Sequence, residues 1–223
     1  MKAIISLCDF SGTWSRPYVG RYVVIRVDPK HPGFVEKMKD GGYSFSGSAA
    51  AMGYLLEQED AMERLSRATG ETITGIHGIL AAPPCTDFAV SGARHFAAKD
   101  ADGRTAASIQ IVEECFRVID AARQHGLTFW VLENPVGRIA RLVPRLGRWK
   151  MTFNPCDYGD PYTKKTCLWG EFNTNLPKTP VEPERVCAQG SWVQRLGGSS
   201  ERTKTLRSIT PPGFAAAFAK ANP

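Results

Sequence analysis

The sequence of 223 residues is short of several features that define whole classes of protein. It has no run of about 18 apolar residues, so we expect no membrane-spanning helix. It has only four histidines, and His77, His95 and His125 lack the spacing of metal ligands. The charged fraction of 22% is moderate, and we find neither an internal repeat nor a long low-complexity tract. These absences exclude a disordered chain and predict a globular protein without a metal centre.

The cysteines are scattered and show no framework spacing. The six lie at positions 8, 85, 115, 156, 167 and 187. The last three fit no common zinc pattern. This distribution favours a compartment that keeps thiols reduced, so we expect a cytoplasmic protein whose thiols are free for chemistry.

Charge is unevenly distributed along the chain, whose formal net charge is +6. Residues 1–137 carry 14 Lys and Arg against 16 Asp and Glu, whereas residues 138–223 carry 14 against 6. A basic half beside a neutral half indicates contact with a polyanion such as nucleic acid. The alternative is a solubilising surface without a partner.

Apolar patterning predicts strands that alternate with helices. We expect strands at 3–7, 22–27, 73–80, 128–132 and 166–169, and helices at 49–68 and 104–125. Residues 31–48 are glycine-rich and are expected to be irregular. This alternation predicts an α/β fold with a mainly parallel sheet and a site at the carboxyl edge of that sheet.

Pro83, Pro84 and Cys85 follow the apolar strand expected at 73–80. Proline fixes the backbone there, which would hold a thiol rigidly at the end of the strand. A thiol presented in this way can act as a nucleophile. The alternative is a structural cysteine in a proline-rich turn, which is how we interpret Cys115 on the helix at 104–125.

Glu133 and Asn134 follow the continuous apolar strand at 128–132. A carboxyl group at that junction can lose its water, which raises its pKa and lets it hold a proton near neutral pH. The alternative is an acid that accepts from backbone N–H groups at the start of a helix.

A tight turn, Phe10-Ser11-Gly12-Thr13, follows the first strand, and Asp28 follows the second. A glycine turn lets a backbone approach a ligand closely, and an acid at the end of the next strand suits a ribose diol. This signal is weak alone because glycine turns after strands are common.

In this order the three motifs resemble the DNA (cytosine-5) methyltransferase family, and most closely its short, phage-borne members. The segment 158–166 is similar to the family's Gly-x-Pro-Gln-x-Arg-x-Arg segment, and 207–211 is similar to its Arg-x-Leu-Thr-Pro segment. The resemblance spans roughly residues 3–215. It implies a Rossmann-like, doubly wound sheet and the cofactor S-adenosylmethionine.

The resemblance also implies roles for individual residues. Cys85 would be the nucleophile that adds to C6 of cytosine, with Glu133 and Lys164 stabilising the base. S-adenosylmethionine would lie against Phe10, Ser11, Gly12, Thr13, Trp14, Asp28 and Pro83. The substrate or nucleic acid would meet Pro84, Asn134, Arg94, Lys165 and Arg207. No metal is implied.

The sequence departs from the family pattern at both ends of the site. Trp14 stands where a second glycine is usual, and Tyr162, Lys164 and Thr166 replace Gln, Arg and Arg. A lysine donates as a point charge, whereas the arginine it replaces can donate bidentately. Lys165 is a rival of Lys164 for the same role. Asp60 and Glu63 are weak candidates for the acid that contacts the adenine amine.

The expected organisation is a catalytic core at 1–170, a short basic recognition segment at 171–206, and a C-terminal strand or helix at 207–223 that returns to the core. The recognition segment has only 36 residues. Its basic residues and Trp192 can track phosphates and stack on a base, but they are too few for long base readout. We therefore expect short or relaxed sequence specificity; a disordered connector is the alternative.

The expected activity is methyl transfer to C5 of cytosine in DNA by a monomer, with the base flipped out of a duplex or already single-stranded. The same chemistry on structured RNA is a rival, as is a catalytically weak relative that only binds nucleic acid. A pyrimidine C5 enzyme of the thymidylate synthase type ranks lower, because no folate or nucleotide-phosphate signature is present.

Overall fold

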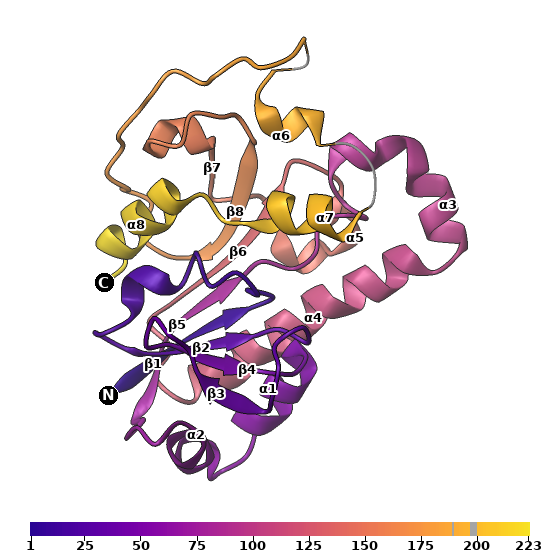
Figure 1. Cartoon of the computed structure of the whole chain (residues 1–223). Coiled ribbons are helices and arrows are strands. Elements are labelled where there is room, and N and C mark those ends of the chain that lie inside the picture. The colour runs from indigo at the N-terminus through magenta and orange to yellow at the C-terminus, as the bar shows by residue number, and fades with distance from the viewer. Residues whose placement is uncertain (189, 197–199) are drawn as a thin grey trace.

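The computed structural model describes residues 1–188, 190–196 and 200–223, and its centre is one eight-stranded sheet (Figure 1). The strand order is β3-β4-β2-β1-β5-β6-β8-β7. The strands, in that order, are Val35–Lys37, Tyr43–Phe45, Val23–Val27, Lys2–Leu7, Gly75–Ala81, Phe129–Pro135, Thr166–Glu171 and Met151–Phe153. The five strands from β4 to β6 are parallel, whereas β3, β8 and β7 join through antiparallel pairings. The predicted mixed α/β fold with a mainly parallel sheet is confirmed.

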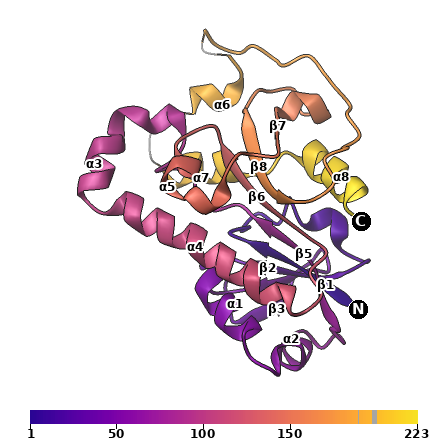
Figure 2. The same ribbon diagram turned by 180° about the vertical axis from the view of Figure 1, so that it is seen from behind.

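Helices lie on both faces of this sheet. They are α1 (Ala49–Leu56), α2 (Ala61–Thr69), α3 (Phe96–Ala101), α4 (Arg104–Arg123), α5 (Ile139–Leu142), α6 (Trp192–Arg195), α7 (Glu201–Ser208) and α8 (Pro212–Ala221). Single 3₁₀ turns are η1 (Arg16–Tyr18), η2 (Val90–His95), η3 (Pro144–Leu146) and η4 (Pro155–Tyr158). Figure 2 shows α4 running along the sheet, with α1 beside it. Among the described residues no helix has the length and apolarity to cross a membrane.

The central strands are buried on both faces, so their sequences read as continuous apolar runs. In β1, Ile5 belongs to the core cluster under α1, α2 and α4, whereas Ile4 belongs to the opposite cluster with Phe214 and Phe218 of α8. Successive side chains of a strand point to opposite faces. The hydrophobic effect therefore holds helices against both sides of β1.

Two local expectations were wrong. The helix expected at 49–68 is two helices, because four consecutive polar residues at 57–60 offer nothing to bury and the chain turns there. The segment 31–48, expected to be irregular, contains β3 and β4. These strands have three residues each, too few for a period-two pattern to stand out.

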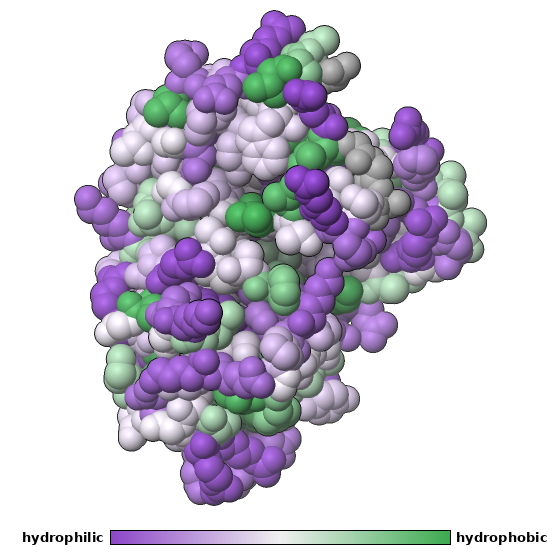
Figure 3. Space-filling view, in the orientation of Figure 1, coloured by the Kyte–Doolittle hydropathy of each residue, from purple (hydrophilic) through white to green (hydrophobic). Residues whose placement is uncertain are grey.

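The connections create a topological switch beside β1. From β1 the chain proceeds to β2 on one side, and it later returns to β5 on the other. In open parallel sheets, ligands bind at the carboxyl ends of the strands at such a point. Figure 1 shows β7, β8, α6 and α7 above the indigo and purple strands, and Figure 3 shows a hollow in this face just below α7.

Candidate active site

Cys85 lies on a tight loop just beyond β5. Pro83 is buried, Pro84 is exposed, and Cys85 is half-buried. The carbonyl oxygen of Cys85 accepts hydrogen bonds from the backbone N–H groups of Phe88 (3.0 Å) and Ala89 (2.9 Å). The strand and this turn together fix the thiol at the carboxyl edge of the sheet.

Two buried cations anchor the loop after Cys85. The Lys99 ammonium of α3 lies 3.1 Å from the Asp87 carboxylate and also donates to the Thr86 carbonyl. The Arg138 guanidinium donates to the Asp87 carbonyl at 3.0 Å and to the Asp100 carboxylate at 2.7 and 2.8 Å. Charge-assisted hydrogen bonds are stronger than neutral ones, so this network ties the loop after Cys85 to α3.

Glu133 and Asn134 lie within the last residues of β6, the strand that pairs with β5. Asn134 is fully buried, and its side-chain N–H donates to the Pro83 carbonyl at 3.0 Å. This bond joins the segment that carries Cys85 to the strand that carries Glu133. The Asn134 Oδ1 atom is buried without a hydrogen-bond partner among the described residues.

Lys164 and Arg207 approach from the C-terminal part of the chain. The Lys164 ammonium donates to the Arg207 carbonyl at 2.9 Å. The Arg207 guanidinium donates to the Leu196 carbonyl at 3.1 Å and to the Ser91 hydroxyl at 3.2 Å. Arg207 therefore links the end of α6, η2 beyond Cys85, and Lys164.

The electrostatics connect these four groups. Burial raises the pKa of the Cys85 thiol, and the Glu133 carboxylate raises it further, while Lys164 and Arg207 lower it. Burial also raises the pKa of Glu133, against the opposing charge of Lys164. Such effects act over short distances, so Cys85, Glu133, Lys164 and Arg207 share one site. Titratable groups whose pKa values are shifted by burial and by neighbouring charges, gathered at one sheet edge, are typical of catalytic centres.

Two other predicted contact residues lie further out. Lys165 is exposed, and it is absent from the charges that act on Cys85 and Glu133, so Lys164 is the lysine that faces them. Arg94 is exposed on η2, and its guanidinium donates to the His95 ring at 3.0 Å.

The turn after β1 is organised by Asp9. Its buried carboxylate accepts from the Gly12 N–H at 2.8 Å. It also accepts from the hydroxyls of Ser6 (2.8 Å), Ser15 (2.9 Å) and Ser11 (3.3 Å). Gly12 has a φ of +67°, and a Cβ there would lie 2.6 Å from Arg26 Nε, so the turn requires glycine.

Phe10, His31 and Asp28 line the space beside that turn. The Phe10 ring is 45% exposed, and its centroid lies 5.3 Å from that of the buried His31 ring. Burial lowers the pKa of His31, and the carboxylates of Asp28 and Asp9 partly oppose this shift. Its Nε2 atom is buried without a partner in the described part of the chain. Ser11, Thr13 and Asp28 are half-buried.

Trp14 points the other way. Its side chain is fully buried in the core, with ring centroids 6.2 Å from Phe214 and 6.0 Å from Phe218. The Tyr18 hydroxyl, four residues on, donates to the Asn222 carbonyl at 3.0 Å. The Trp14 side chain thus secures the turn from beneath and does not line the space at Phe10.

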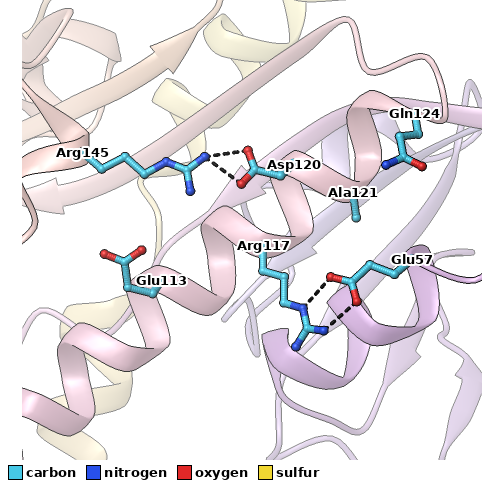
Figure 4. A pocket seen from close by; sticks show the side chains of 7 residues that line it. All are labelled: Glu57, Glu113, Arg117, Asp120, Ala121, Gln124 and Arg145. Atoms are coloured by element: carbon cyan, nitrogen blue, oxygen red, sulfur yellow. Dashed lines mark hydrogen bonds and ion pairs between the residues drawn. The ribbon is translucent and has the colours of Figure 1, made fainter.

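A surface depression lies elsewhere, over the C-terminal half of α4 (Figure 4). It measures about 290 Å³, and ion pairs with N···O distances of 2.6 Å join Arg117 to Glu57 and Arg145 to Asp120 across it. Because α4 leads directly into β6, this end of the helix lies at the amino edge of the sheet, opposite Glu133.

Sequence patterns did not reveal the roles of Asp9, His31 and Lys99. An acid directly before the Phe10 turn is a usable signal for Asp9, whereas a lone histidine or lysine gives none. The weak candidates Asp60, which is the N-cap residue of α2, and Glu63, on α2, are exposed and pair with Arg64 (2.7 Å) and Arg67 (2.6 Å). Among the described residues, no three His, Cys, Asp or Glu side chains are placed to hold a metal ion.

Known proteins resemble this chain in structure rather than in sequence. No family model matches the chain, and no curated protein matches it. The chain is similar to a structure from E. coli assigned as a DNA modification methyltransferase encoded within a prophage, at 14% identity, 90% coverage of this chain and a TM-score of 0.48. It is also similar to the Entamoeba histolytica methyltransferase EhMeth, at 11% identity, 90% coverage and a TM-score of 0.39.

The chain spans 56% of the length of the first of these proteins and 61% of the second. At identities this low and TM-scores below 0.5, the likeness does not define the chemistry of this chain.

Proposed function

We propose that this chain transfers a methyl group from S-adenosylmethionine to C5 of cytosine in DNA, through a covalent adduct between Cys85 and C6. The observation that carries the proposal is the convergence of a thiol, a carboxyl group of raised pKa and an ammonium, those of Cys85, Glu133 and Lys164, at the carboxyl edge of β5 and β6. This set meets the needs of a reaction in which a poor carbon nucleophile must first be activated.

The chemistry assigns one task to each group. The Cys85 thiolate adds to C6, forming a C–S bond and moving the C5–C6 electron pair to C5, which becomes nucleophilic. Protonated Glu133 donates to N3, and Lys164 donates to the carbonyl oxygen, so both stabilise the charge that develops on the ring. C5 would then form a C–C bond to the donor methyl group as the donor's S–CH3 bond breaks and leaves a neutral thioether. Water would accept the proton from C5, and breaking of the C6–S bond would return the Cys85 thiolate and restore the aromatic base.

The raised pKa values suit these roles differently. A raised pKa keeps Glu133 protonated at a higher pH than an exposed glutamate, and only the protonated form can donate to N3. For Cys85 a raised pKa disfavours the thiolate, so the positive charges of Lys164 and Arg207 are needed to recover it.

The residues at the end of β1 fit an adenosine group. Phe10 offers an exposed aromatic face, Asp28 offers a carboxylate for a ribose diol, and the buried Nε2 of His31 has no partner among the described residues. Ser11, Gly12 and Thr13 would bring the backbone close, with Pro83 alongside. When bound, S-adenosylmethionine supplies the electrophilic methyl group, and the chain's own residues orient it and exclude water.

The C-terminal part would carry the DNA contact. The segment 171–206 is tied to the loop before β8, since the N–H groups of Thr179, Val181 and Glu184 donate to the carbonyls of Asp157, Cys156 and Pro161. Such anchoring argues for a recognition segment and against a free connector. Its shortness supports relaxed specificity, and a buried site requires a flipped or single-stranded cytosine.

Transfer of a tritiated methyl group to DNA, with identification of the labelled base, tests the proposal. We expect 5-methylcytosine from the wild type and a covalent complex with DNA that contains 5-fluorocytosine. If only RNA becomes labelled, RNA and not DNA is the substrate. Label on another atom or base, or full activity in Cys85→Ala, would reject the mechanism.

A further inference from the structure

An aromatic pair stands beside the proposed base site and has no part in the chemistry. The rings of Tyr162 and Trp192 have centroids 5.1 Å apart and planes inclined by 56°. Both side chains are half-buried, so part of each remains accessible to solvent. Tyr162 belongs to the loop that carries Lys164, and Trp192 opens α6 in the recognition segment.

Tyr162 lies on the side of the site that Glu133 faces. Its loop directly precedes β8, whose first residue, Thr166, is paired with Pro135 at the end of β6. Burial raises the pKa of the Tyr162 phenol, and the charges of Asp160 and Glu133 add to the rise. The phenol is therefore within electrostatic reach of Glu133, and Tyr162 lies two residues along the loop from Lys164.

Trp192 is held in place by its neighbours. The Thr163 N–H donates to the Ser191 hydroxyl at 3.0 Å, and the Gln194 side-chain N–H donates to the Thr163 carbonyl at 2.8 Å. These two bonds flank Trp192 in the sequence and dock α6 on the residue after Tyr162. The aromatic pair is thus preorganised, which lowers the entropic cost of binding a planar ligand.

We propose that Tyr162 and Trp192 form a stacking platform for the base that neighbours the target cytosine on the same DNA strand. The identity of the ligand rests on the proposed function. Every base has a π-face, so stacking tolerates any sequence, whereas hydrogen bonds to base edges would select one. The platform would hold the strand in register while leaving the neighbouring base unread, which accounts physically for relaxed specificity.

The test is a thermodynamic cycle on DNA binding. The probe is a labelled single-stranded oligonucleotide with one cytosine. Two further oligonucleotides have the same sequence but carry an abasic position on the 5′ or on the 3′ side of that cytosine. Trp192→Ala removes the platform, and Trp192→Phe keeps a π-face. Trp149→Ala is the matched control, because that tryptophan is 45% exposed and lies between Arg148 and Lys150, outside the pair.

We expect Trp192→Ala to weaken binding of the intact oligonucleotide by about tenfold, with Trp192→Phe recovering most of the loss. Trp149→Ala should bind like the wild type. One of the two abasic positions should weaken the wild type by a similar factor and leave Trp192→Ala unaffected, because the two changes remove the same contact. Circular dichroism of each variant checks that it is folded.

Equal affinities of Trp192→Ala and Trp149→Ala would overturn the platform. So would abasic losses that are as large in Trp192→Ala as in the wild type at both positions. This assay needs no methyl transfer, so its failure is separate from failure of the proposed function. If the enzyme transfers methyl groups but Trp192→Ala and the abasic position are not coupled, only the platform is rejected. If the two changes are coupled but no methyl group is transferred, the proposed reaction is rejected.

Discussion

Glu133 lies in β6, and Cys85 lies on the loop four residues beyond β5, the strand that pairs with β6 in parallel, whereas Lys164 and Arg207 lie on a loop and on α7. The first pair, here named the strand wall, is positioned by the two paired strands and by the hydrogen bonds that fix the loop after β5. The second pair, the loop wall, is positioned by side-chain bonds such as that from Lys164 to the Arg207 carbonyl.

The two pairs differ in how precisely their side chains are held. Backbone ladders in a buried sheet hold their ends within narrow limits, which suits groups that must meet a reacting atom. Contacts made by long side chains are easier to rearrange, which suits a surface that admits and releases a polymer. Substitutions in the strand wall should therefore remove activity outright, and those in the loop wall should tune it.

The largest expected effect comes from the nucleophile. Cys85→Ala should lower methyl transfer by more than about a thousandfold, because no other group can form the C–S bond. Cys156→Ala is the control, since that thiol is half-buried in η4, away from β5 and β6 in the sequence. Steady-state rates on DNA measure both. If Cys156→Ala is the inactive variant, the strand wall does not carry the reaction.

Glu133→Gln should reduce kcat by about 10²- to 10⁴-fold, since the amide keeps the shape but cannot supply the carboxyl proton. KM should change little. Glu171→Gln on the neighbouring β8 is the control, because that carboxylate pairs with Arg123 at 2.7 Å far from the carboxyl edge. A Glu133→Gln variant with normal kcat would remove Glu133 from the mechanism.

Lys99→Met probes the support behind the strand wall. It leaves the buried Asp87 carboxylate without its ammonium partner and should cost about 3 kcal/mol of unfolding free energy. Lys37→Met removes a lysine that is 62% exposed and should leave the urea midpoint unchanged. Equal midpoints for the two variants would show that the Asp87 network does not stabilise the fold.

The smallest effect is expected in the loop wall. The positive charge of Lys164 lowers the pKa of Cys85, so Lys164→Gln should raise that pKa further. Only the thiolate reacts with iodoacetamide, so the alkylation profile of the Cys85 peptide should move to higher pH. Lys165→Gln should leave the profile in place. A shift with Lys165→Gln instead would reverse the assignment of the two lysines.

Strand patterns predicted the positions of Cys85 and Glu133 well, for a physical reason. A continuous apolar run marks a buried strand, and parallel strands bring their carboxyl ends to one edge. The choice between Lys164 and Lys165 could not come from the sequence, because their loop has no periodicity to say which one points inward. The link from Arg207 to Ser91 spans more than a hundred residues and depends on tertiary packing alone.

Trp14 shows the limit of matching by position. Its place in the motif indicates a ligand contact, but the chain turns at Gly12 and sends the indole into the core against Phe214 and Phe218. Burial of so large an apolar side chain stabilises the fold, and this gain in free energy decides where the Trp14 indole lies more than its position in the motif does. Short strands such as β3 and β4 were missed because three residues carry little periodic signal.

The packing of α8 against Trp14 has a consequence for the order of biosynthesis. The turn at residues 10–13 emerges first from the ribosome, yet its supporting core is filled by Phe214 and Phe218 from the other end of the chain. A nascent chain that ends before residue 212 would leave Trp14 and Tyr18 without that cover. The turn that we propose to hold an adenosine group should therefore reach its final packing only after α8 has left the ribosome and folded against Trp14.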